Sequence, residues 1–192
     1  MDTEAKTYNQ GTFVNSVLSG KGIKISVINE ILTIYIGDVK NNLKEGKGKE
    51  DTVEYIYEGL FKNNKKHGQG NLKYKINKDS YQGEFNDGNI TGFGFYIWQN
   101  QHTYLGDFVN GQMHGKGLYK WIDGEEYEGE YVNNIKEGKG VFKWGDGRVF
   151  KGGFHDGKPH GKGILEFNGA KIDVEFSEGK LIGPLRSGKS YC

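Results

Sequence analysis

The sequence has little proline, almost no cysteine and no long apolar run. Only 2 prolines and 1 cysteine occur among its 192 residues, and that cysteine, Cys192, stands last. A single thiol cannot form a disulfide within the chain, so a reducing compartment such as the cytoplasm is expected. No apolar stretch approaches the ~20 residues of a transmembrane helix. The N-terminal Met-Asp-Thr-Glu segment does not resemble a signal peptide.

The chain also lacks an excess of either charge. It has 26 basic and 25 acidic side chains, a net charge of +1. Proteins that bind nucleic acid through general electrostatic attraction usually carry a basic excess, so no nucleic-acid partner is expected. What the chain has in abundance is glycine, at 32 residues, together with 12 tyrosines and 11 phenylalanines. Disordered chains are poor in aromatic residues, so this composition indicates an ordered but unusual fold.

Glycine and aromatic residues recur in one repeated pattern. Each unit begins aromatic-x-Gly-x-aromatic, has Gly or Asn three residues later, and has Gly-x-Gly after four more. Units start near residues 9, 35, 57, 81, 104, 127, 150 and 172, most of them 22 to 24 residues apart, and the copies at both ends are weaker. Short units at a fixed period are typical of stacked repeat proteins, in which atypical end units face solvent.

Each unit predicts one β-hairpin. Residues 127–131 alternate with the period of a strand, Asn133-Asn134 forms a turn, and residues 138–144 form the second strand. Asp146-Gly147 is a signal for a two-residue hairpin turn, and Asp87-Gly88 and Asp123-Gly124 predict similar turns.

Strand alternation places aromatic residues and glycines on one face and mostly charged residues on the other. Aromatic rings that lie over glycines of neighbouring strands are known to support such sheets. The predicted fold is therefore all-β: an elongated, twisted antiparallel sheet of about eight stacked hairpins, solenoid-like. We expect one array over residues 9–185 and a C-terminal tail over 186–192.

The pattern resembles the MORN family (membrane occupation and recognition nexus). The resemblance is specific in the middle units, such as Tyr81/Gly83/Phe85 and Tyr127/Gly129/Tyr131, and extends loosely over nearly the whole chain. It implies one hairpin per repeat and a non-enzymatic scaffold in a cytoskeletal, ciliary or axonemal assembly such as the radial spoke. Some members bind phosphoinositides, and some carry a kinase or methyltransferase domain, for which no residues remain here.

A protein partner is the first functional hypothesis. On the mostly charged face, three apolar residues of 92–98 and three of neighbouring strands would form a patch, and exposed patches of this kind mark interfaces. A terminal segment that covers this patch is the alternative. Aromatic residues are frequent binding anchors, although packing over glycine explains most of them here. The candidate partner-binding residues are Phe93, Phe95, Ile97, Leu105, Val109, Leu118, Trp98, Tyr119, Trp121 and Trp144.

An anionic membrane is the alternative partner. Lysines recur inside the Gly-x-Gly step, and a row of them on one face could bind phosphoinositides. Acidic residues share that face, so cross-strand pairs of opposite charge are the simpler account. Unpaired strand edges at the ends of the sheet would also permit a homodimer. The lysines concerned are Lys21, Lys47, Lys116, Lys139 and Lys162.

No catalytic site, cofactor or metal site is predicted. Residues 183–190 match the phosphate-loop pattern G-x-x-x-x-G-K-S, but only two residues follow Ser190, where the motif requires a helix. His67, His114 and His160 occupy equivalent repeat positions and are interpreted as turn residues. Consecutive histidines of this set are separated by two hairpins, or roughly 19 Å, which is too far for them to bind one zinc ion together.

Overall fold

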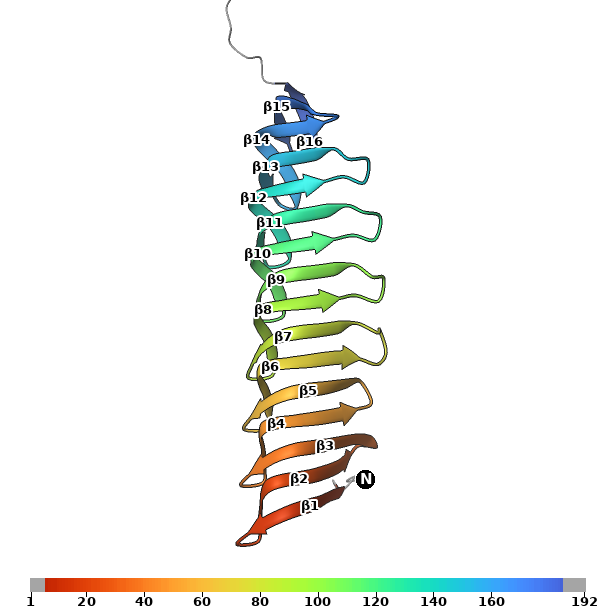
Figure 1. Ribbon diagram of the computed structural model, residues 1–192, viewed down its shortest axis with the longest axis vertical. Helices are drawn as coiled ribbons and strands as arrows, with labels where there is room; N and C mark the ends of the chain where they lie inside the picture. The colour runs from red at the N-terminus through yellow and green to blue at the C-terminus, as the bar shows by residue number, and fades with distance from the viewer. Residues whose placement is uncertain (1–5, 185–192) are drawn as a thin grey trace, which may run out of the picture. The chain divides into compact units, whose positions relative to one another are not determined.

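The computed structural model describes residues 6–184, which form two compact units divided between Gln99 and Asn100. Both units consist of β-strands, turns and short connections (Figure 1). Residues 6–184 contain no helix, so this part of the chain has no helix that could cross a membrane. The predicted all-β fold of stacked antiparallel hairpins is confirmed.

The first unit contains eight strands, and each pairs antiparallel with the next along the chain. Odd-numbered and following even-numbered strands form the hairpins, red to yellow-green in Figure 1. The strands are β1 (Lys6–Val14), β2 (Val17–Ile28), β3 (Ile31–Lys40), β4 (Leu43–Thr52), β5 (Tyr55–Lys62), β6 (Lys65–Tyr74), β7 (Ser80–Asn86) and β8 (Asn89–Ile97).

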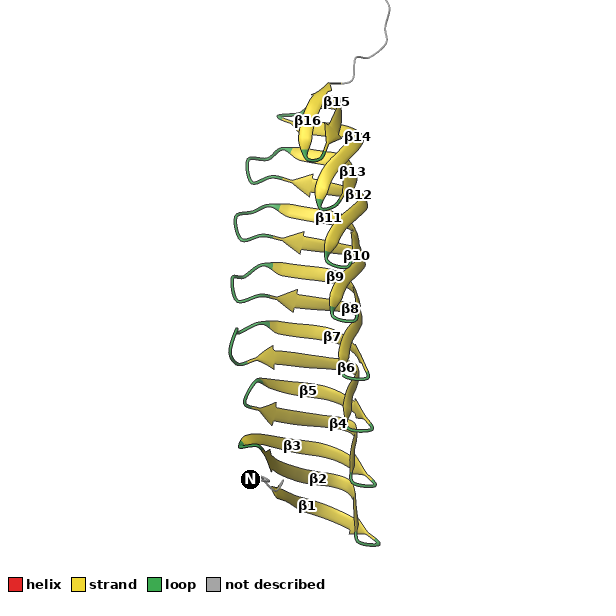
Figure 2. Cartoon of the chain, turned by 180° about the vertical axis from the view of Figure 1, so that it is seen from behind, coloured by secondary structure: helices red, strands yellow, loops and turns green. Residues whose placement is uncertain are grey.

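The second unit repeats this arrangement with eight further strands, again paired antiparallel in chain order. Strands and connections alternate regularly along it in Figure 2. The strands are β9 (Thr103–Val109), β10 (Gln112–Lys120), β11 (Glu126–Val132), β12 (Ile135–Lys143), β13 (Val149–His155), β14 (Lys158–Phe167), β15 (Ala170–Ser177) and β16 (Lys180–Pro184).

The tight turn of each hairpin explains why the repeat has Gly or Asn at one position. In the turn Asn133-Asn134, φ is 49° and 70°, the left-handed conformation that Asn and Gly tolerate best. The second turn residue also attaches its hairpin to the one before: the Asn134 N–H donates to the Met113 carbonyl at 2.9 Å. Its side-chain Oδ1 accepts from the Met113 N–H at 2.8 Å, a bond that glycine at this position could not make.

Two of the three predicted Asp-Gly turns are wider than expected. Asp87-Gly88 is a two-residue turn with φ of 49° and 91°. At Asp146-Gly147 only the glycine has positive φ, and the Trp144 N–H donates to the Arg148 carbonyl at 2.9 Å across a five-residue connection. Asp123-Gly124 lies in an equivalent connection. A type I turn followed by one left-handed glycine is the common longer hairpin loop, and Asp-Gly suits both geometries.

A register shift inside each hairpin was not predicted. In the hairpin of β5 and β6, Gly59 pairs with Gly70, but the next pair is Leu60 with His67, so β6 has two extra residues there. One of them, Gly68, has a φ of 59°. The shift bends the hairpin: ring centroids of Tyr57 and Phe61 are 5.0 Å apart, although four residues of extended strand span about 13 Å.

The first tyrosine of the repeat fills the inside of this bend. Tyr57 is fully buried, and a Cβ added to Gly59 would lie only 2.5 Å from its hydroxyl oxygen. A Cβ added to Gly70 would lie 2.5 Å from ring atom Cε2. Glycine is therefore required on both paired strands because the ring lies against their backbones, as the aromatic–glycine pattern predicted.

The tyrosine hydroxyl also holds the bulge. Tyr57 Oη donates to the Leu60 carbonyl at 2.8 Å, and burial raises the pKa of Tyr57 to about 12, so the hydroxyl remains a donor. The equivalent bonds are Tyr35 to Asp38, Tyr81 to Glu84, Tyr104 to Asp107 and Tyr127 to Glu130. Phe150 takes this position in one hairpin and has no hydroxyl to donate.

Buried rings form the core of each unit. Edge-to-face contacts connect successive hairpins; for example, Phe85 lies 5.0 Å from Tyr57 and 5.3 Å from Tyr81, centroid to centroid. The connected rings of the first unit are Tyr35, Phe61, Tyr57, Phe85 and Tyr81. Those of the second are Phe108, Tyr104, Tyr131, Tyr127, Phe154, Phe150 and Phe176. We call this side the ring face and the opposite side the outer face.

Candidate functional site on the outer face

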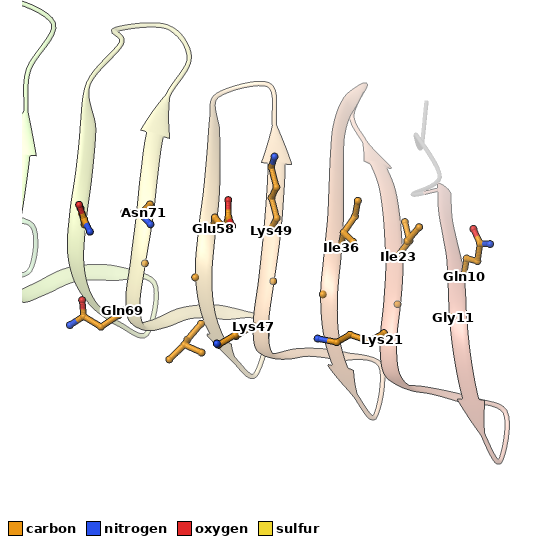
Figure 3. A pocket seen from close by; sticks show the side chains of 17 residues that line it. Gln10, Gly11, Lys21, Ile23, Ile36, Lys47, Lys49, Glu58, Gln69 and Asn71 are labelled. Atoms are coloured by element: carbon orange, nitrogen blue, oxygen red, sulfur yellow. The ribbon is translucent and has the colours of Figure 1, made fainter.

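A groove crosses the outer face of the first unit. It encloses about 900 Å³, and the backbones of glycines such as Gly48, Gly59 and Gly70 form part of its lining. Side chains diverge on either side of this glycine line because the hairpins bend there. Figure 3 shows the two rows, one including Ile36, Lys49, Glu58 and Asn71, the other including Lys21, Lys47 and Gln69.

The groove combines positive charge with amide and apolar side chains. Three lysines and one glutamate line it, together with four amide side chains and the apolar Ile23, Ile36 and Leu60. Ile36 is 54% exposed. Amide side chains can both donate to and accept from a peptide backbone. This lining suits an extended polar chain with some negative charge.

The five lysines of the Gly-x-Gly steps all lie exposed on the outer face, but they differ in the residue that pairs with them on the next strand. Lys21 forms an ion pair with Asp38, Nζ to Oδ1 2.5 Å. The other Asp38 oxygen, Oδ2, accepts from the Lys47 N–H at 2.9 Å. The hydrogen bond from Lys21 contributes most to holding the pKa of Asp38 below its usual value. Asp38 therefore joins the lysine of one hairpin to the bulge amide of the next strand.

Acidic residues occupy the Asp38 position in most hairpins. Asp107 accepts from the Lys116 N–H at 3.3 Å, and Glu130 and Glu175 lie opposite Lys116 and Lys162 in register. Lys47 and Lys139 are the exceptions, because Leu60 and Gly153 stand opposite them. Neither lysine has an ion pair within residues 6–184. The five lysines are thus not equivalent, which their shared sequence position could not show.

The predicted apolar patch divides between the two units. In the first, Phe93 is 54% and Ile97 36% exposed, while Phe95 is half-buried beside Gln82. In the second, Leu105 and Val109 are exposed, and Leu118 is half-buried opposite Leu105. Each unit therefore carries apolar side chains on its outer face, and partner binding by these residues stays a prediction.

The predicted aromatic anchors lie on the ring face, where each packs against a neighbouring aromatic ring. Trp98 lies 4.5 Å from Tyr96, and Tyr119 lies 4.4 Å from Trp121, centroid to centroid. Trp144 lies 4.9 Å from Phe142. All four anchors are half-buried, so each keeps part of its ring at the surface.

The sequence pattern did not reveal that several lysines lie on the ring face, among them Lys44, Lys66 and Lys136. Lys66 Nζ lies 3.7 Å from the ring centroid of Tyr55, and Lys136 Nζ lies 4.8 Å from that of Phe142. Burial lowers the pKa of Lys66 and of Lys136. Both stand just after a tight turn, opposite Phe61 and Tyr131. Pairing residues outward from each two-residue turn places these two lysines opposite ring residues of the preceding strand, so the sequence contained this signal in its turns.

The three histidines are not turn residues. They lie in β6, β10 and β14 beside the bulges, where their partners in register are Leu60, Asp107 and Gly153. The Nδ1 atoms of His67 and His114 are buried without a hydrogen-bond partner, and His160 Nδ1 lies 3.4 Å from Glu178 Oε1. Residues 6–184 contain no cluster of three or more potential metal ligands. Most of the phosphate-loop match, residues 185–190, falls outside the described residues.

These features define a repeat protein in which each glycine–aromatic hairpin leaves an open outer face. The model of the MORN repeat matches six segments, residues 35–52, 57–77, 81–103, 104–126, 127–147 and 150–169. The chain therefore belongs to the MORN-repeat family, whose repeats are non-catalytic modules of protein or membrane interaction. The hairpins β1–β2 and β15–β16 lie outside these matches. Among curated proteins, none matches this chain closely enough to count as a relative.

Proposed function

We propose that this protein is a non-enzymatic scaffold that binds other proteins through the outer faces of its repeats. The observation that carries the proposal is that the two faces of the repeats differ in which side chains they bury and which they expose. The rings that hold the hairpins together are buried on one side, whereas Phe93, Leu105 and Val109 are each at least 40% exposed on the other. Apolar residues exposed on an otherwise charged face favour a protein partner.

A cytoskeletal assembly, such as a ciliary or axonemal complex, is the setting that the family resemblance favours. Extraction of cells that carry a tagged full-length chain tests this setting. The protein should stay in the insoluble residue after mild non-ionic detergent and leave it at high salt. Release by detergent alone from a membrane fraction would contradict the proposal.

Phosphoinositide binding is the second candidate, and the two unpaired lysines favour it. Lys47 and Lys139 carry charges that no carboxylate opposite them balances. Two acidic residues argue against phosphoinositide binding. Glu58 and Asp38 belong to the same outer face as Lys47, and an anionic membrane would repel them. Liposome binding by the full chain should then be weak even at low salt. Strong binding that falls steeply between low and moderate salt would favour the lipid function instead.

A further inference from the structure

The repeat has a position for a carboxylate that Leu60 does not supply. Where Asp38 stands in β3, its oxygens serve Lys21 Nζ and the Lys47 N–H together. In the next hairpin, Leu60 stands at the position equivalent to Asp38. The side chain of Lys47 is there equivalent to that of Lys21, and the backbone N–H of Gln69 is equivalent to that of Lys47. Leucine has no oxygen to offer either group. The Lys47 ammonium group and the Gln69 N–H therefore have no carboxylate between them at position 60, although Asp38 lies beside the Lys47 backbone and Glu84 pairs with Gln69 on the other side.

This position opens into the groove of the first unit. Lys47, Leu60 and Gln69 all line it. Leu60 lies over Gly68, as Asp38 lies over Gly46: an added Cβ on either glycine would be 2.9 Å from the side chain above it. Leu60 is only half-buried, so a carboxylate from another molecule can approach the ammonium group of Lys47 beside it.

We infer that the groove binds an extended peptide segment of a partner protein, with one carboxylate side chain placed beside Leu60 to contact Lys47 and Gln69. The inference rests on the proposed scaffold function and names the chemistry of a partner. The partner's carboxylate would complete the arrangement that Asp38 completes within the chain. Hydrogen bonds between an ammonium group and a carboxylate are among the stronger ones in proteins.

The rest of the groove fits a peptide better than a membrane. The side chains of Gln69, Asn71 and Gln82 line it and can bond to the backbone of an extended chain. Ile23 and Ile36 offer apolar contacts further along. A flat anionic surface would meet Glu58 as well as the lysines. The lining residues span β1 to β7, about 29 Å at ~4.8 Å per strand, which matches about nine residues of extended peptide.

Fluorescence anisotropy with the full chain tests the inference. The probe is a labelled peptide of about nine residues, alternating threonine and valine, with a central glutamate. Its partner probe has glutamine at the centre. We expect the glutamate peptide to bind about tenfold more tightly, the scale of one charge-assisted hydrogen bond. Equal binding of the two peptides, or binding of neither, would overturn the inference.

Variants at the two key positions locate the effect. Leu60→Asp supplies the carboxylate within the chain and should abolish the preference for glutamate, as should Lys47→Gln. Leu60→Ala removes the same side chain without adding charge and should keep the preference. Circular dichroism establishes that each variant is folded. Loss of the preference in Lys139→Gln but not in Leu60→Asp would place the peptide on the second unit and refute the inference.

Two further measurements distinguish a bound peptide from a membrane, and the groove from the scaffold function. Vesicles of equimolar phosphatidylserine and phosphatidylcholine test membrane binding. If the chain binds these vesicles, Lys47→Gln abolishes that binding and the chain shows no preference for the glutamate peptide, the inference is overturned in favour of lipid. In cells, retention of the wild-type chain in the cytoskeletal residue tests the scaffold function itself. If the wild-type chain is retained there but shows no preference for glutamate, the scaffold stands and the inference fails.

Discussion

Replacement of Gly70 by alanine should destabilise the first unit far more than an ordinary glycine-to-alanine change. Gly70 does not have a positive φ, so alanine introduces no backbone strain there. Its Cβ would instead lie 2.5 Å from Cε2 and 2.6 Å from Cζ of Tyr57. Because carbon atoms in contact rest ~3.5 Å apart or more, the ring must retreat by about 1 Å.

The expected cost follows from what the Tyr57 ring contacts. Overpacking a filled site costs ~1–3 kcal/mol. Displacing the ring also weakens the hydroxyl bond to the Leu60 carbonyl, worth ~1 kcal/mol. The edge-to-face contacts with Phe61 and Phe85 add ~0.5–1.5 kcal/mol each. Partial loss of these contributions gives about 3–5 kcal/mol for Gly70→Ala. Gly145→Ala, whose added Cβ would meet only the Asp123 carbonyl oxygen, at 3.1 Å, should cost less than ~1 kcal/mol.

Urea unfolding followed by circular dichroism measures the cost, and hydrogen exchange locates it. Because the chain forms two compact units, amides of β5 to β7 should lose protection while those of the second unit keep theirs. A double-mutant cycle with Tyr57→Leu tests the cause. Without the ring, Gly70→Ala should cost less than ~1 kcal/mol. A cost that is small in the wild-type background, or unchanged in the Tyr57→Leu background, would show that contact with the ring is not the cause.

Three further predictions follow from single contacts. Tyr57→Phe keeps the ring but removes the donor to the Leu60 carbonyl, so urea unfolding should show a loss of ~1 kcal/mol, and no loss would exclude a role for the hydroxyl. Asn134→Gly keeps the left-handed turn but loses the hydrogen bond from the Met113 N–H, so it should also cost ~1 kcal/mol. Gly157→Ala loses no side-chain hydrogen bond, but it should cost about as much because alanine is strained at the positive φ of Gly157. The hydrogen bond to Glu137 raises the pKa of His155 and that from His155 lowers the pKa of Glu137. Their pairing should therefore stabilise the fold between about pH 4.5 and 6.5 and fade as pH rises through the pKa of His155 or falls through that of Glu137. NMR titration should show the His155 pKa returning toward its ordinary value in Glu137→Gln, and an unchanged pKa would contradict the pairing.

The sequence was sufficient to predict the strands and the two faces, because both depend on local pattern. Tyr127, Gly129 and Tyr131 repeat at strand period two, and Asn133-Asn134 requires a left-handed turn. The bulge was not predictable in this way. It arises because a fully buried tyrosine must fit between two glycines, and only the folded hairpin shows that two residues of the next strand are then left unpaired.

The candidate site was predicted less completely than the fold. The five lysines of the Gly-x-Gly step looked equivalent in the sequence, and each of them lies exposed on the outer face of its own unit. Which of them has an acid opposite depends on cross-strand register, and the bulge shifts that register. For the same reason the partner of Lys47 is Leu60, a pairing that spacing alone did not indicate.

Photo-crosslinking in living cells is the sharpest test of the scaffold function. A photoreactive amino acid placed at Phe93, exposed on the outer face, should crosslink the chain to other proteins; the same substitution at Phe142, buried on the ring face against Trp121 and Trp144, should crosslink far less. Mass spectrometry of the products identifies the partners. A scaffold that binds through its outer face should give discrete protein adducts from Phe93. Adducts only with lipid, or equal protein adducts from both faces, would contradict the scaffold function.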